Sequence, residues 1–200
     1  VEIHGAHGYI LAQFLSGKIN QRQDQYGGSL ENRGRLVRDI IDGIRVRCSS
    51  DFILGLRLSP ERFDLELADM LAFTQTILSD GKIDFLDMSL WDVFKEPVDE
   101  EFKGRSLLSY FTDLERGNVA LGIAGKLRTP EEIRQAMATN IDFILLGRAA
   151  ILHHDYPLQM QANADFKPVS NPVSPEYLHS EGLSETFVKY MRNWKGFVAE

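Results

Sequence analysis

The sequence predicts an α/β protein in which parallel β-strands are joined by crossover helices. Short apolar runs alternate with longer amphipathic segments along most of the 200 residues, a pattern typical of repeated βα units. Residues 52–58 form a nearly continuous apolar run, as expected for a parallel strand that is covered on both faces. Two architectures have this pattern: an open doubly wound sheet and a (β/α)8 barrel.

Local signals divide the chain into elements. Ser29 has the residue type that caps a helix start, and Thr129 followed by Pro130 is a stronger signal of the same kind. Asp80 and Gly81 are typical of a helix end. We expect strands at 1–4, 52–58, 83–89, 119–124 and 143–146, and helices at 10–16, 30–47, 65–78, 107–114, 130–139, from 149 and at 183–195, with residues 167–175 extended.

The barrel is the better of the two architectures. No Gly-x-Gly-x-x-Gly motif follows any of the five strands, so the dinucleotide-binding open sheet loses its main support. Five units cannot close an eight-stranded barrel. We therefore predict that residues 1–163 are the last five β/α units of a (β/α)8 TIM barrel, and that residues 164–200 form an extended tail and a terminal helix packed on it. Because the chain opens in a strand and without methionine, we expect about three units in front of it.

Composition excludes several classes of partner. The chain has 22 basic and 29 acidic residues, a net charge of −7, so non-specific binding to nucleic acid or to an anionic membrane is disfavoured. Its single cysteine, Cys48, excludes an internal disulfide and fits a reducing compartment. No apolar run approaches ~18 residues, and no basic-then-apolar leader opens the chain. We expect a cytoplasmic protein.

Chemistry should collect where the strands end, because parallel α/β folds bind ligands at the carboxyl ends of their strands. The first strand ends in His4, and His7 and Tyr9 follow within five residues. Two imidazoles and a phenol form a group of hydrogen-bond donors that works near neutral pH. The plain alternative is a chance pair of histidines satisfied by backbone. A zinc site ranks lowest, because no Cys, Glu or third His lies nearby at ligand spacing, and we expect no metal.

Arginine and glycine end the other strands. Arg57 would either pair with a structural carboxylate such as Glu2 or Asp87, or stabilise negative charge on a bound cofactor. The last two strands end in Gly125-Lys126 and Gly147-Arg148. Glycine lets backbone amides approach phosphate, and the cations supply countercharge, so we favour a phosphate site over simple turns.

Together these segments resemble the Old Yellow Enzyme family of FMN-dependent NAD(P)H oxidoreductases. The matching residues run in family order over about the first 155 positions. They are residues 1–9 (Val-Glu-Ile-His-Gly-Ala-His-Gly-Tyr), 13–16, 24–33 (Asp-Gln-Tyr-Gly-Gly-Ser-Leu-Glu-Asn-Arg), 55–59 (Gly-Leu-Arg-Leu-Ser), 128–132 and 146–149, with a bacterial-type tail at 190–197.

The resemblance implies a barrel that holds FMN non-covalently, with NAD(P)H as reductant. His4 and His7 would hydrogen-bond the substrate carbonyl, and Tyr9 would donate a proton to the α-carbon. Arg57 would lie at the flavin pyrimidine edge. The residues expected to bind the cofactor are His4, Arg57, Gly125, Lys126, Gly147 and Arg148.

The expected activity is hydride transfer from NAD(P)H through FMN to an activated alkene, such as an α,β-unsaturated carbonyl. Reduction of a quinone, a nitro compound or oxygen is one alternative, and a non-catalytic half-barrel is another. We expect a small electrophilic alkene as partner and no nucleic acid or membrane; a homo-oligomer stays open. Two departures from the family pattern are Gly17-Lys18-Ile19 and Lys126. The iron–sulfur branch is excluded, because no cysteine cluster follows the barrel.

Overall fold

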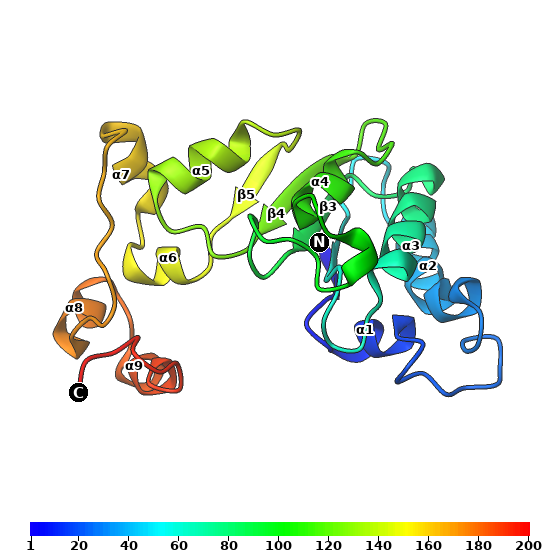
Figure 1. The fold of residues 1–200 in the computed structure, drawn as a ribbon, viewed down its shortest axis with the longest axis horizontal. Helices are drawn as coiled ribbons and strands as arrows, with labels where there is room; N and C mark the ends of the chain where they lie inside the picture. Colours follow the sequence, from blue (N-terminus) through cyan, green and yellow to red (C-terminus); the bar gives the residue numbers. More distant parts are fainter. The chain divides into compact units, whose positions relative to one another are not determined.

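The computed structural model describes residues 1–200. The chain divides into two compact units. The first unit comprises residues 1–126 and 137–145, and the second comprises residues 127–136 and 146–200. Figure 1 traces the elements of both units.

The first unit contains a five-stranded parallel sheet. Its strands are β1 (Glu2–Gly5), β2 (Gly55–Leu58), β3 (Phe85–Ser89), β4 (Ala120–Ala124) and β5 (Phe143–Leu145). They lie in the order β1-β2-β3-β4-β5, and every neighbouring pair is parallel. A doubly wound sheet reverses its order at a switch point, whereas a barrel adds each strand beside the last. The predicted barrel type of sheet is therefore confirmed, with five of the eight strands.

The helices of this unit are α1 (Ile10–Leu15), α2 (Leu30–Arg47), α3 (Leu67–Asp80) and α4 (Leu107–Thr112), with a 3-10 turn at Glu100–Phe102. In Figure 1, α2 and α3 lie side by side. Alternate strand residues are apolar and fully buried, as are the inner faces of the two long helices. They are Leu56, Leu58, Leu86, Met88, Leu121 and Ile123 on the strands and Val37, Ile41, Phe73 and Ile77 on the helices.

The predicted helix signals are used as expected. The Ser29 side chain accepts a hydrogen bond from the backbone of Asn32, and Gly81 ends α3 in the left-handed conformation at φ 62°. Before α5 (Pro130–Met137), the carboxylate of Glu132 accepts hydrogen bonds from the backbone of Arg128 and Thr129, at 2.7 and 2.9 Å. Strand β2 starts later than predicted, because the backbone N–H of Leu54 donates to a side chain instead of to a strand.

The side chain that accepts this hydrogen bond is that of Asp84, which belongs to an Ile-Asp-Phe motif. This motif occurs twice and is called the Ile-Asp-Phe device below. The sequence Ile-Asp-Phe stands at residues 83–85 and again at 141–143. In the first copy, the Asp84 carboxylate accepts the backbone N–H of Leu54 at 2.7 Å. In the second, the Asp142 carboxylate accepts the backbone N–H of Leu121 at the same distance. Each aspartate thus fastens the start of one strand to the strand before it.

The phenylalanines of this device fill the space above two glycines. A Cβ at Gly55 would lie 2.0–2.5 Å from ring atoms of Phe85, and one at Gly122 would lie 2.1–2.7 Å from ring atoms of Phe143. The two rings meet edge to face, with centroids 5.8 Å apart. Glycine at these two strand positions therefore makes room for the phenyl rings. The rings lie on the face of the sheet opposite to the buried leucines, which is called the inner face below.

The second unit has its own small core. Beside most of α5 it contains α6 (Arg148–Leu152), α7 (Tyr156–Ala162), α8 (Pro175–Ser180) and α9 (Glu185–Met191). Its buried core residues are Leu152, Val173, Leu178, Val188, Met191 and Phe197. Helix α8 was not predicted, because its three nearby prolines favour an extended chain; Ser174 caps it and Pro175 takes the first helical position. The predicted boundary after residue 163 stays a prediction.

Across both units, no helix is long and apolar enough to cross a membrane.

Arg33 joins three parts of the first unit. This arginine is buried, and its guanidinium donates to the carbonyl oxygen of Leu15 at the end of α1 and to that of Gly28 before α2. It also pairs with the carboxylate of Asp69 on α3, at 2.9 Å. Arg33, the last residue of the segment at 24–33 that carries the family resemblance, therefore has a structural use, which is to fix the loop between α1 and α2.

We predict that Arg33→Met lowers the free energy of unfolding by about 3 kcal/mol, because removing one partner of a buried pair leaves the other groups unsatisfied. Arg38→Met is the matched control on the same helix. Arg38 is partly exposed and meets only Asp80, at 3.6 Å, so its loss should cost less than about 1 kcal/mol. Urea unfolding of the full-length protein measures both, and equal losses would contradict the role of Arg33.

Candidate active site

One row of side chains crosses the inner face of the sheet. The strand register aligns His4 with Arg57, Arg57 with Asp87, and Asp87 with Gly122. Side chains at aligned positions of parallel strands point to the same face. The row lies near the carboxyl ends of the strands, where β1 and β2 each continue for one residue.

The residues after β1 bring three rings together. The ring of His4 lies 5.2 Å from that of His7 and 5.3 Å from that of Tyr9, between centroids. The close approach depends on a sharp turn, because His7 and Gly8 both have positive φ angles, of 59° and 74°. Tyr9 is 61% exposed. The predicted group of hydrogen-bond donors therefore exists as one cluster.

The surroundings of both imidazoles in this cluster favour the neutral form. Burial lowers the pKa of His4, the charge of Arg57 lowers it further, and Glu2 acts against them. Burial and the charge of Arg57 also lower the pKa of His7, with a contribution from His4. A neutral imidazole still offers one N–H donor.

Arg57 contacts the protein through its Nε atom, and its two terminal nitrogens are free. Its Nε donates to the hydroxyl of Ser89 at 2.7 Å and lies 2.9 Å from a carboxylate oxygen of Asp87. Its two terminal nitrogens make no hydrogen bond or ion pair with the protein. The pairing with Asp87 was one of the two roles considered for Arg57, and it leaves the second role open, since four N–H donors remain available.

Two neighbours of this cluster, Ser59 and Phe63, were not expected from the sequence, and neither was a stacked pair formed by Arg62. The hydroxyl of Ser59 accepts the backbone N–H of His7 at 3.0 Å, and the ring of Phe63 meets that of His7 edge to face. The guanidinium of Arg62 lies 3.9 Å from the ring centroid of Trp91. Ser59 could have been found, because it stands two residues after Arg57. The positions of Arg62 and Phe63 could not have been found, because they depend on a turn in which both residues adopt positive φ, and nothing in a non-glycine sequence signals such a turn.

Gly125 and Lys126 follow β4 and pack against the chain after β3. A Cβ at Gly125 would lie 2.9–3.2 Å from backbone atoms of Trp91 and Asp92, so glycine is required by the protein's own backbone. Lys126 has φ 51° and its ammonium lies 3.1 Å from the carboxylate of Asp92. The cation of Lys126 therefore already has a partner.

Gly147 and Arg148 belong to the second unit. Both are exposed, and a Cβ at Gly147 would meet nothing within 4 Å. Arg148 makes no ion pair with a carboxylate, and burial together with the charge of Arg128 lowers its pKa. Two arginines close enough to repel each other, without an acidic partner, suit a negatively charged ligand.

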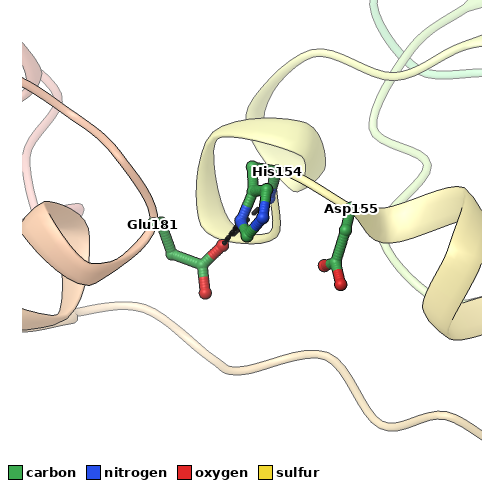
Figure 2. A group of neighbouring side chains, drawn as sticks. All are labelled: His154, Asp155 and Glu181. Atoms are coloured by element: carbon green, nitrogen blue, oxygen red, sulfur yellow. Dashed lines mark hydrogen bonds and ion pairs between the residues drawn. The ribbon is translucent and has the colours of Figure 1, made fainter.

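A second cluster of ionisable groups lies elsewhere in the second unit. Figure 2 shows it: His154, Asp155 and Glu181, with ligand atoms within 4.8 Å of one another. Glu181 accepts the backbone N–H of His154 at 2.9 Å and lies 2.8 Å from Nδ1 of its ring. The Asp155 carboxylate accepts the side-chain amide of Gln159 at 2.7 Å. Both carboxylates therefore have partners within the protein. The pair of His154 and Glu181 joins the chain after α6 to the end of α8.

The parallel sheet, in which each strand pairs with the next along the chain, is the barrel type of sheet predicted above, and it carries an imidazole and a guanidinium at aligned positions. A family model described as the NADH:flavin oxidoreductase / NADH oxidase family matches residues 1–165, so the chain belongs to this family. The resemblance to the Old Yellow Enzymes is thereby confirmed.

Individual relatives agree with this assignment. The NADH-dependent flavin oxidoreductase iccE of Talaromyces variabilis is 29% identical over 197 residues, which covers 90% of this chain and 46% of that protein. Two structures of morphinone reductase, one in complex with tetrahydroNAD, superpose with TM-scores of 0.65 and 0.66 at 23% identity. They cover 89% of this chain and 46% of theirs, and this likeness shows the fold. The chain thus spans about half the length of the relatives it matches.

The pair of His154 and Glu181 should make stability depend on pH. Its hydrogen bond raises the pKa of His154 above the ordinary 6.5. Burial acts to raise the pKa of Glu181, but the hydrogen bonds from His154 outweigh it and the pKa falls below 4.5. A raised histidine pKa stabilises the fold below the unfolded pKa, and this is lost as pH rises through the folded pKa; the carboxylate contribution is lost as pH falls.

We therefore predict that His154→Asn loses most stability between pH 4.5 and 6.5, and progressively less above. Thermal unfolding at about pH 5.5 and pH 8.5 measures the difference. In a Glu181→Gln background the same substitution should lose this pH dependence. A penalty that does not change with pH would mean that the ion pair contributes nothing.

Proposed function

We propose that this chain contributes to an FMN-dependent oxidoreductase that passes hydride from NAD(P)H to an activated alkene, such as an α,β-unsaturated carbonyl. The observation that carries the proposal is the alignment of His4 with Arg57 on neighbouring strands, with the rings of His7 and Tyr9 beside His4. Membership of the flavin oxidoreductase family and the names of its relatives give the proposal its cofactor and its reductant.

The donor set suits FMN. The pyrimidine edge of its ring system collects negative charge on reduction, and the free end of Arg57 offers N–H donors and a positive charge to such an edge. Neutral histidine donors suit an uncharged carbonyl oxygen. For the phosphate, the residues that the resemblance implies are Gly125, Lys126, Gly147 and Arg148, of which Arg148 has an uncompensated charge.

When bound, FMN would supply a two-electron carrier that takes hydride from NAD(P)H and delivers it to the β-carbon of the alkene. His4 and His7 would each donate an N–H to the substrate carbonyl and stabilise the negative charge that develops on its oxygen. Such preorganised donors contribute about 3–4 kcal/mol each at a water-excluded site. The hydrogen bond of Ser59 to the His7 backbone keeps the second imidazole in place.

Tyr9 would supply the proton to the α-carbon. Its ring lies beside that of His4, it is well exposed, and its hydroxyl has no hydrogen-bond partner in the protein. A general acid in this position accelerates the reaction about 10²–10⁴-fold.

We predict that Tyr9→Phe slows alkene reduction about 10²-fold or more and leaves the reduction of FMN by NAD(P)H unchanged, because only the second half-reaction needs a proton on carbon. Stopped-flow measurement of each half-reaction in the full-length protein separates the two. Tyr190→Phe, at another exposed tyrosine, is the control. Unchanged alkene reduction would remove the role of Tyr9 and favour a quinone, a nitro compound or oxygen as the acceptor.

Binding of FMN tests the first requirement of the proposal, which is that the protein holds this cofactor. Purified full-length protein mixed with FMN and desalted should retain a flavin absorption band. Arg57→Met should weaken binding of FMN, since it removes the free guanidinium. Protein that retains no flavin would favour the alternative of a non-catalytic half-barrel.

A further inference from the structure

Asp87 is the most unusual ionisable residue of the sheet. It lies at the centre of β3 and is fully buried, with 0% of its surface exposed. Neither of its carboxylate oxygens accepts a hydrogen bond. Buried carboxylates are nearly always hydrogen-bonded, so an exception of this kind needs an explanation.

Its one polar contact is with Arg57. The carboxylate oxygen lies 2.9 Å from Nε of Arg57, but the N–H of that atom is directed to the hydroxyl of Ser89. The contact is therefore a contact of charges without a hydrogen bond, and it depends on the carboxylate being ionised. On its other side, Asp87 is aligned with Gly122, above which the ring of Phe143 lies. No water-like environment is available there to stabilise the anion.

Burial and the surrounding charges together place the pKa of the Asp87 carboxyl near neutral pH. Burial raises the pKa of Asp87 to about 7, Arg57 acts to lower it, and Glu2 on β1 acts to raise it further. The remaining titratable group in the row is His4, whose lowered pKa favours the neutral form. Asp87 can therefore exist both with and without its proton near neutral pH, whereas Arg57 is always charged.

We propose that Asp87 is a titrating countercharge that tunes Arg57, and through it the affinity of the site for the reduced, negatively charged flavin. This inference rests on the proposed function. Ionised Asp87 cancels the charge of Arg57 and lowers the attraction of the site for a negative pyrimidine edge. Protonated Asp87 leaves the guanidinium uncompensated. Asp87 acts through Arg57 and touches neither substrate nor cofactor, so it is a positioning residue.

The consequence is a link between reduction of the cofactor and proton uptake. Negative charge that arrives next to Arg57 competes with Asp87 for the same guanidinium. The carboxylate then takes up a proton from solvent, and the charge of the row is conserved. The two electrons and the hydrogen come from NAD(P)H, and only the proton on Asp87 is additional.

The test compares Asp87→Asn with the unchanged protein. The midpoint potential of bound FMN, titrated against redox dyes, gives the ratio of its affinities in the reduced and oxidised states. At about pH 8.5 the variant should favour reduced FMN about tenfold more, a shift of about 30 mV for two electrons. At about pH 5.5, where Asp87 of the unchanged protein carries a proton, the ratio should change less than about twofold.

Ser89→Ala is the matched control. It removes the hydrogen bond to the same Nε of Arg57 but no charge, so its effect on the potential should be equal at both pH values. A merely structural role of Asp87 would likewise give equal changes at both. Equal changes for Asp87→Asn would therefore overturn the inference.

A second measurement does not involve the cofactor. Carbon-13 NMR of labelled aspartate in the full-length protein without FMN should show Asp87 titrating at about 7. Glu2→Gln should lower this midpoint, and a midpoint in the ordinary range of aspartate would overturn the inference. The two levels of failure are distinguishable: protein that binds no FMN refutes the proposed function, whereas protein that binds FMN without the pH-dependent difference refutes only the role of Asp87.

Discussion

The register of the parallel sheet is the constraint on which the rest of the candidate site depends. Strands β1, β2 and β3 align His4, Arg57 and Asp87 in one row, although successive members of the row lie 53 and 30 positions apart in sequence. A shift of one residue in any strand would turn its member of the row to the opposite face, among the buried leucines. The fold therefore has to fix register before it can build a site. The repeated Ile-Asp-Phe device does this at two strand starts, where Asp84 and Asp142 each bind the backbone of the preceding strand.

The same device explains the shape of the inner face. Phe85 and Phe143 cover Gly55 and Gly122, so aromatic rings occupy the amino-terminal part of the inner face while the carboxyl ends carry polar groups. These rings offer no hydrogen-bond donor, and this is also why Asp87 is buried without a hydrogen bond. A carboxylate in that position costs stability when it is ionised, and Arg57 offsets only part of this cost. Residues that cost stability without an evident structural gain are often those that serve function.

The histidines and the tyrosine depend on local geometry instead of register. The left-handed turn at His7 and Gly8 folds Tyr9 back beside His4, and the hydroxyl of Ser59, directly after β2, fixes the turn through the backbone of His7. Arg57 influences both imidazoles by lowering their pKa. One guanidinium therefore links the donor cluster on β1 with the buried carboxylate on β3, and its free end is left for a ligand.

The sequence by itself determined the succession of elements, the barrel type of the sheet, the family, and the set of polar residues at the strand ends. These follow from short-range signals: apolar periodicity, capping residues such as Ser29, and motifs that occupy consecutive positions. Only the tertiary structure decided that Arg57 pairs with Asp87 in place of Glu2, that Lys126 is already paired, and that Ser59 and Phe63 adjoin His7. Helix α8 likewise forms because Leu178 has a core to enter. Such choices depend on distances between strands and on burial, and no stretch of consecutive residues encodes either of them.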